Sequence, residues 1–351
     1  FQTGRFPLYT VPPGAWAVSF ADTGRPNHGV KGPAEAAQVR DLALRTKDPY
    51  ALWYGGGTAD EAGFDPKPPV DLPQSILYRF IGWSVFNTSL VDGREGVTFA
   101  LRSGPFWAGH QHEDLNSFVL NAYGEKLAID SGYYDWYGSP HFTQYSVLTR
   151  AHNAILVDGK DQGSRKVGMD GAITSWFDSP GYGFTVGSIT KPTMYESRLK
   201  SWDRCALFIK PGLVILHDVL SAAQDSAQYD WLLHTVAPID IDAATQGFRL
   251  TSGQARLSGR FLTPQKVDLA VKAGYPVEPV DGYSTRPVPP DQYAHEWTLT
   301  ATPQSKRGNE EFLVALQIQR EGDTDSATFE AIPTQDGLAA QCKTPQQTTL
   351  V

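Results

Sequence analysis

The segment Ser117–Asp130, SFVLNAYGEKLAID, is the part of the sequence that most clearly decides the fold. It contains two short apolar runs on either side of a Tyr-Gly-Glu turn. Apolar runs of this length around a glycine-containing turn predict an antiparallel β-hairpin. A hairpin centred between Gly124 and Glu125 places Asp130 opposite Val119. The segment therefore predicts β structure in this part of the chain.

Strand-like segments continue outward from this hairpin and fill most of the chain. From Gln74 onward, runs of β-branched and aromatic residues recur at intervals of roughly 10 to 20 residues, with turn formers between them. This spacing leaves no room for crossover helices. The expected fold class is mainly β, an antiparallel β-sandwich over residues 74–351. Helix is expected only near residues 33–55, residues 1–30 are expected to be irregular, and the acidic, proline-rich residues 58–73 to form a linker.

The composition predicts a globular chain without nucleic-acid or membrane partners. Of 351 residues, 41% are hydrophobic, and the formal net charge is −8. A negative chain does not coat nucleic acid or anionic membranes, and no apolar run reaches the ~18 residues of a membrane span. Cys205 and Cys342 could form one disulfide, but two small buried side chains are favoured. The first residue, Phe1, predicts a processed or cut product.

Four of the chain's eight histidines lie between residues 107 and 162, close to carboxylates and tyrosines. Neutral imidazole and carboxylate are ligands that Zn²⁺ accepts. Histidine and tyrosine are also the side chains most easily set up as proton donors and acceptors. This combination predicts an enzyme active site or half of one. The alternative is a set of histidines that satisfy hydrogen bonds in a polar core without a metal.

The spacing of these residues requires a bend in the chain. In an extended segment, His110, His112 and Asp114 would project from one face. The predicted hairpin would leave Asp130 about five residues from Asp114, or roughly 16 Å along a straight strand. The GHQHED segment therefore has to bend off the strand, which Gly109 would permit.

The ordered series of motifs resembles the β-sandwich domain of the heparinase II/III-type polysaccharide lyases. HxHxD, YGExLAxDSGYY, YGSPH and TRAHNAILVDGxxQ follow one another in the region from about Gly96 to Gln162. The series is also similar to that domain in other uronate-specific lyases, including those acting on alginate. The resemblance implies a helical toroid before the sandwich, and residues 1–57 look like its last remnant. The rest of the toroid would lie upstream or on a separate chain.

The resemblance also implies a metal site and a cleft. Carried over by motif position, the family's zinc ligands fall on His112, Asp130 and His152, with one structural Zn²⁺ ion expected. His110 falls on a histidine at the substrate cleft, and Tyr137 falls where related lyases present a cleft tyrosine. The alternative for Tyr137 is an aromatic loop packed over the sheet, or a platform on which sugar rings stack.

The implied reaction is β-elimination on a uronate-containing anionic polysaccharide of the alginate or glycosaminoglycan type. This reaction needs a group that neutralises the carboxylate, a base and an acid. We expect His110 and Tyr137 to fill two of these roles. The remaining candidates are Tyr145 for catalysis and His141, Arg150 and Asn153 for substrate binding. Asn153 could instead fix a loop. Cations that could attract the polymer, or be solvated surface charges, are Arg150, Lys160, Arg165 and Lys166.

Two other functions fit the sequence. One is a carbohydrate-binding β module that lost catalysis with its toroid. The other is a metal-dependent hydrolase with Asp114 or Asp130 as its base. A serine hydrolase is not expected because the sequence has no GxSxG elbow. A secreted or periplasmic location is expected for the lyase.

Overall fold

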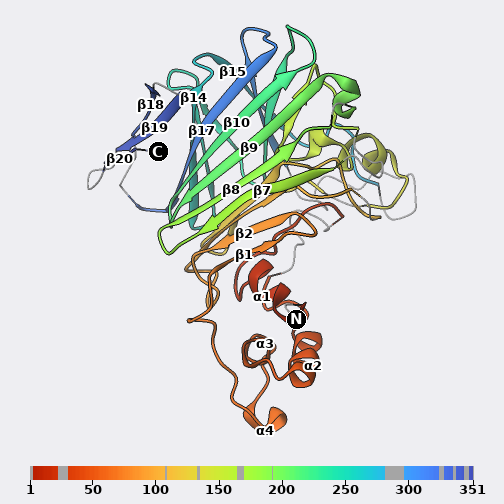
Figure 1. Ribbon diagram of the computed structural model, residues 1–351, viewed down its shortest axis with the longest axis vertical. Helices are drawn as coiled ribbons and strands as arrows, with labels where there is room; N and C mark the ends of the chain where they lie inside the picture. Colours follow the sequence, from red (N-terminus) through yellow and green to blue (C-terminus); the bar gives the residue numbers. More distant parts are fainter. Residues whose placement is uncertain are drawn as a thin grey trace.

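The protein is dominated by β-strands, as Figure 1 shows. The computed structural model describes residues 3–22, 31–106, 109–132, 135–163, 170–191, 193–280, 296–323, 328–334, 337–343 and 348–350. Within these ranges the strands form four antiparallel sheets, which confirms the expected fold class. In the described residues, no helix combines the length and the apolar character needed to cross a membrane.

The four sheets have a simple order. The five-stranded sheet runs in chain order through β1 (Ser75–Tyr78), β2 (Trp83–Asn87), β3 (Val97–Arg102), β4 (Ser117–Ala122) and β5 (Glu125–Ala128). The eight-stranded sheet has the order β12 (Asp240–Asp242), β13 (Gly247–Ser252), β14 (Ala255–Thr263), β17 (Asn309–Arg320), β10 (Leu213–Ala222), β9 (Leu199–Ile209), β8 (Tyr182–Ile189) and β7 (Gly171–Asp178). The four-stranded sheet has the order β15 (Val267–Ala273), β16 (Trp297–Pro303), β11 (Tyr229–Thr235) and β6 (Ile155–Val157). The three-stranded sheet consists of β18 (Thr328–Thr334), β19 (Gly337–Lys343) and β20 (Thr348–Leu350).

The five-stranded and four-stranded sheets both pack on the eight-stranded sheet and form the sandwich. Phe99 on β3 lies 6.4 Å from Phe208 on β9, measured between ring centroids. Trp231 on β11 lies edge to face on Phe261 of β14 at 5.2 Å. All four rings belong to one continuous buried core. The sheets are therefore held together by burial of apolar surface between two layers.

The three-stranded sheet packs on the other face of the eight-stranded sheet. Phe329 and Cys342 are buried there against Leu213 and its neighbours. Cys342 is a free thiol, and Cys205 is also free and half-buried. The two cysteines therefore do not form a disulfide. The sequence analysis favoured this outcome.

The α-helices of the described residues lie at the N-terminal end of the chain (Figure 1). They are α1 (Phe6–Thr10), α2 (Ala36–Thr46), α3 (Pro49–Tyr54) and α4 (Ala59–Ala62). Short helical turns also occur, and these are η1 (Thr3–Arg5), η2 (Phe142–Ser146), η3 (Thr149–Ala151) and η4 (Met194–Ser197). The expectation of helix only near residues 33–55 is wrong for α1, for α4 and for the four short turns. The sequence contains the reason for α4, because Thr58 and Glu61 form a capping box at its first turn.

The N-terminal segment covers the face of the five-stranded sheet that points away from the sandwich core. Leu8 and Leu52 from the helices pack in one buried cluster with Val85, Ala100 and Val119 from the sheet. β3 and β4 are consequently buried along their whole length. A sheet covered on both faces explains why these strands are nearly continuous apolar runs. The division into residues 1–57, 58–73 and 74–351 stays a prediction.

The central hairpin has a different register from the one expected. Its turn is centred between Tyr123 and Gly124, one position before the predicted centre between Gly124 and Glu125. Both turn residues have positive φ, 54° and 79°, which is the backbone that two-residue hairpins favour. The strand pairing then shifts by one residue, and β5 ends two residues before Asp130. The expected pairing of Asp130 with Val119 is therefore wrong.

A buried ion pair in the eight-stranded sheet ties several segments together. Arg204 on β9 donates to both carboxylate oxygens of Asp218 on β10, at 2.6 and 3.0 Å, and both side chains are fully buried. The indole of Trp202 donates to the same carboxylate at 2.8 Å. The third guanidinium nitrogen donates to the backbone carbonyls of Asn116 and Asn153 at 2.8 and 2.5 Å. One side chain thus links two strands and two loops.

We expect Arg204→Met to lower the free energy of unfolding by about 3–5 kcal/mol, because it leaves the charge of Asp218 buried without its partner. Urea unfolding followed by tryptophan fluorescence measures this loss. The matched control is Arg45→Met, whose 75% exposed side chain pairs with Asp41 at the surface. The control should cost less than about 1 kcal/mol. A loss this small for Arg204→Met would contradict the assignment.

Candidate metal centre

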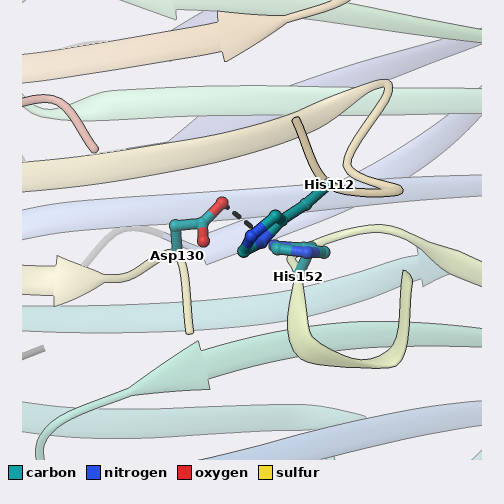
Figure 2. Close-up of side chains that lie close together, drawn as sticks. All are labelled: His112, Asp130 and His152. Carbon is teal, nitrogen blue, oxygen red and sulfur yellow. Dashed lines mark hydrogen bonds and ion pairs between the residues drawn. The ribbon is translucent and has the colours of Figure 1, made fainter. Parts of the chain in front are cut away.

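Three side chains from separate segments converge at one buried point. His112 precedes β4, Asp130 follows β5, and His152 precedes β6. One ligand atom from each lies within 4.8 Å of the others, and all three side chains are buried. Figure 2 shows the two imidazoles and the carboxylate side by side, with His152 Nδ1 3.0 Å from Asp130 Oδ2. The residues implied as ligands by the resemblance are therefore together in space.

The backbone bends where the expected spacing required it. Residues 109–116 are not part of a strand, and His110 and Asn116 both have positive φ, 65° and 58°. Such φ values are uncommon for residues other than glycine, so they mark a sharp local change of direction. The bend occurs at His110 and not at Gly109, and it carries His112 into the interior.

Hydrogen bonds from Asn153 fix the segments that carry Asp130 and His152. Its amide donates to the backbone carbonyls of Phe118 and Ile129 at 2.7 and 2.8 Å. Its side-chain oxygen accepts from the backbone N–H of His234 at 2.7 Å. Asn153 is fully buried, so the expectation that it contacts substrate is not met. It fixes the loop next to His152, which was the alternative for this residue.

The chemistry of the cluster fits a metal ion. Among the described residues, neither Nδ1 of His112 nor Nε2 of His152 has a hydrogen-bond partner, although both atoms are buried. Unpaired buried acceptors are costly, so each such atom needs an explanation. Burial, together with the nearby His152, lowers the pKa of His112 in spite of a hydrogen bond to Asp22. Two imidazoles with a carboxylate form a donor set that could hold a metal ion.

Asp22 is a site residue that the sequence analysis missed. Its Oδ1 lies 2.5 Å from Nε2 of His112, and its Oδ2 lies 2.7 Å from Nδ1 of His110. Burial opposes ionisation of Asp22, but the bonds to the two histidines outweigh it and hold the pKa of the carboxyl below its ordinary value. Asp22 lies 90 residues before His112 in a stretch of turn formers, so no local pattern marks it.

Two of the predicted catalytic residues are at the surface next to the cluster. The side chain of His110 is 78% exposed. Tyr137 is 64% exposed, and its ring lies 5.2 Å from that of Phe142. Phe142 in turn lies 5.9 Å from the ring of His112. Both residues are therefore accessible to a ligand, and their roles stay predictions.

Two other candidates lie in the interior. His141 is fully buried, with Nδ1 2.5 Å from the carbonyl oxygen of Val277. Tyr145 is 2% exposed and donates its phenol proton to the carboxylate of Glu296. Burial, reinforced by the charge of Glu296, raises the pKa of Tyr145 well above its ordinary value. Aromatic neighbours enclose both residues, so their burial argues against the catalytic role expected for Tyr145 and the substrate contact expected for His141.

The candidate cations near the motif are paired with acids where the structure describes them. The side chain of Arg150 is 41% exposed and forms an ion pair with Asp161. Lys160 lies 3.3 Å from a carboxylate oxygen of Glu196. The remaining two cations, Arg165 and Lys166, lie outside the described residues. An attraction of these groups for an anionic polymer stays a prediction.

Glu296 is a second residue that the sequence analysis missed. It lies within a buried group next to the candidate metal centre, formed with Tyr145, Ser131 and His234. Burial raises the pKa of Glu296 to about 8, against the lowering effect of the hydrogen bonds from Ser131 and Tyr145. Burial likewise lowers the pKa of His234 to about 3. The group is therefore largely uncharged at neutral pH.

Comparison with known families identifies the class of the chain. The model of the heparinase II/III-like C-terminal domain matches residues 71–312. The chain belongs to the heparinase II/III-like family. No curated protein matches the sequence.

Solved structures support the same fold. The chain is similar to a heparinase III gene product with a TM-score of 0.75 and 14% identity, over 98% of this chain and 50% of that one. It is similar to the heparan sulfate lyase HepC from Pedobacter heparinus with a TM-score of 0.75 and 15% identity, over 98% of this chain and 51% of that one. At these identities the likeness establishes the fold. The chain spans about half the length of the structures it matches.

We expect the purified chain to retain one divalent metal ion per molecule and His152→Ala to lose it, because the substitution removes one of three ligands. Elemental analysis after dialysis against metal-free buffer measures the content. His217→Ala is the control, since this histidine lies outside the cluster and pairs with Glu311. Equal metal content in His152→Ala and the unaltered chain would contradict the assignment, as would less than one ion in the latter.

We expect stability to fall as the pH rises from about 4.5 to 8, because folded Glu296 keeps a proton that the unfolded chain loses. Below about pH 4.5 the folded and the unfolded state both hold the proton, and Glu296 no longer makes the stability depend on pH. The slope from this one group is at most about 1.4 kcal/mol per pH unit. Glu296→Gln keeps a neutral group at this position, so the free energy of unfolding measured in urea should change less with pH. Glu311→Gln, which alters a half-exposed side chain, should leave the pH dependence unchanged. Parallel slopes for Glu296→Gln and the unaltered chain would reject this origin.

Proposed function

We propose that the chain is the β half of a lyase that cleaves a uronate-containing anionic polysaccharide by β-elimination. The observation that carries this proposal is the position of two exposed proton-transfer groups beside the buried cluster. His110 shares the carboxylate of Asp22 with His112. Tyr137 packs on Phe142, which contacts the same imidazole. A surface with these groups is what a β-elimination site requires of its acid–base partners.

We propose Zn²⁺ as the metal and a structural role for it. Two imidazole nitrogens and a carboxylate oxygen from His112, Asp130 and His152 are a donor set that zinc accepts, with a fourth position for water or another group. When bound, the ion would supply a fixed point between three chain segments. It would thereby hold the loop of His110 at the surface above the cluster.

The proposed chemistry assigns proton transfer and charge neutralisation to this chain's own residues. The proton next to the uronate carboxylate becomes acidic only when the carboxylate charge is neutralised. The imidazole of His110 is suited to hydrogen-bond that carboxylate or to move the proton. The phenol of Tyr137 is suited to act as base when ionised and as acid when protonated. Abstraction of the proton and departure of the neighbouring glycosidic oxygen then yield an unsaturated uronate.

The substrate and the partner domain are proposed from the class of relatives. The name of the Pedobacter enzyme, a heparan sulfate lyase, supports a glycosaminoglycan as the substrate class, with alginate as the alternative. Because the chain spans about half of that enzyme, we propose that a helical toroid on the same or a separate chain completes the cleft. Such polymers lie outside the cytoplasm, so the proposed location is secreted or periplasmic.

A carbohydrate-binding β module without catalysis is the second candidate. The observation that favours it is the same half-length coverage, since a cleft without its helical side lacks part of its wall. A metal-dependent hydrolase with Asp114 or Asp130 as base has no such support, since both side chains are buried and Asp130 belongs to the candidate metal centre. Asp114 is fully buried in an ion pair with Arg102 and has no access to a substrate.

The test of the proposed function is the ultraviolet absorbance of the unsaturated uronate product. The chain is assayed alone and together with a toroid domain, on heparan sulfate and on alginate. In the active combination, His110→Ala and Tyr137→Phe should each lower turnover by about 10²- to 10⁴-fold while metal content and fold are retained. The control is Tyr182→Phe, a half-exposed tyrosine on β8.

Product formation separates the two candidates. If no uronate polymer yields absorbance in any combination but the chain binds one of them, the binding module is correct. If elimination occurs and both variants keep the turnover of the control, the assignment of His110 and Tyr137 is wrong.

A further inference from the structure

A single carboxylate lies between the buried cluster and the exposed histidine. Asp22 accepts from His112 through one oxygen and contacts His110 through the other, at 2.5 and 2.7 Å. His112 is fully buried, whereas the side chain of His110 is 78% exposed. We infer that Asp22 is a positioning residue that couples the metal centre to His110. The inference rests on the metal part of the proposed function and not on its reaction.

The atoms that Asp22 contacts determine which nitrogen of His112 is left for a metal. Its carboxylate takes Nε2–H, so Nδ1 carries the lone pair, and Nδ1 is the buried nitrogen without a hydrogen-bond partner among the described residues. A carboxylate behind a metal-binding imidazole fixes the tautomer and the ring orientation and raises the basicity of the ligand atom. In His152, Nδ1 lies 3.0 Å from Asp130, the proposed carboxylate ligand, and Nε2 is buried without a hydrogen-bond partner among the described residues.

The backbone around Asp22 supports a specific placement. Ala21 has a φ of 62° and His110 a φ of 65°, and both values lie in the left-handed region that residues with a Cβ rarely adopt. Unfavourable backbone of this kind persists where surrounding contacts impose it, often at functional sites. Here it turns the carboxylate of Asp22 and the ring of His110 toward each other.

The segment of Asp22 is also in close contact with the segment of Asp130. A Cβ atom on Gly132 would lie 2.3 Å from the carbonyl oxygen of Ala21, so only glycine permits this approach. Phe20, the residue before, is 2% exposed and packs edge to face on Trp83 at 5.1 Å. Asp22 is thus held from two sides and is 9% exposed at its side chain.

Sharing one carboxylate makes the two histidines dependent on each other. The side chain of His110 is highly exposed, and within the described part of the chain its polar contact is the one with Asp22. Without that contact its ring would rotate freely in solvent, as exposed side chains do. A change in the charge on the ring of His112 therefore alters the contact between Asp22 and His110.

The first test compares zinc affinity in chelator competition for the unaltered 351-residue chain and for Asp22→Asn. We expect Asp22→Asn to bind zinc about 10- to 100-fold more weakly, since this is the usual cost of losing such a partner. The matched control is Asp65→Asn, which alters an exposed carboxylate far from the centre in sequence. Its zinc affinity should stay within about twofold of that of the unaltered chain. Circular dichroism of the chelated proteins establishes that both variants are folded. Asp22→Asn with the affinity of the control would overturn the inference.

The second test uses the unaltered chain and so does not depend on a variant that folds. Nitrogen-15 histidine spectra are recorded with and without zinc, and His110→Gln identifies the signals of His110. We expect zinc to shift the ring signals of His110, although this residue is no ligand, and we expect the shift to disappear in Asp22→Asn. Zinc binding without any change at His110 would overturn the coupling. Absence of polysaccharide cleavage would bear on the proposed reaction and would leave this result standing.

Discussion

The buried ion pair between Arg204 and Asp218 is the interaction on which the candidate site depends. Burying both charges is costly, and the cost is offset because each of the three guanidinium nitrogens donates to at least one acceptor. Two of those acceptors are the carbonyls of Asn116 and Asn153, which lie next to the segments of His112 and His152. The rigid eight-stranded sheet thereby sets the position of two loops that carry no regular structure.

The site is assembled at the end of the five-stranded sheet from segments far apart in the sequence. His112, Asp130 and His152 arrive from three strand ends, and Asp22 arrives from the segment that packs outside the sheet. Precise placement of loop residues needs a second set of contacts, because loops have few of their own. Here the amide of Asn153 and the carboxylate of Asp22 provide them. The arrangement places a closed polar centre under an accessible surface.

Much of the fold could be predicted from the sequence, and less of the site. Strand spacing identified the sandwich, but the hairpin register was missed because Tyr123 adopts the positive φ usually reserved for glycine. The order of the motifs, through the family resemblance, predicted that the three cluster residues lie together. Asp22 and Glu296 were missed because contacts between distant segments leave no local pattern. The burial of Tyr145 could not be foreseen either, since a polar aromatic loop looks the same whether it faces solvent or a buried carboxylate.

The covering of the five-stranded sheet by the helical segment has a consequence for how the chain can be divided. Val85, Ala100 and Val119 have their partners in residues that precede the sheet, such as Leu8 and Leu52. A shortened polypeptide that starts at residue 74 would present this apolar sheet face to water. Exposed surface of that kind promotes self-association. The boundary suggested by the proline-rich stretch would therefore produce an aggregating fragment, and a soluble one has to retain the helices.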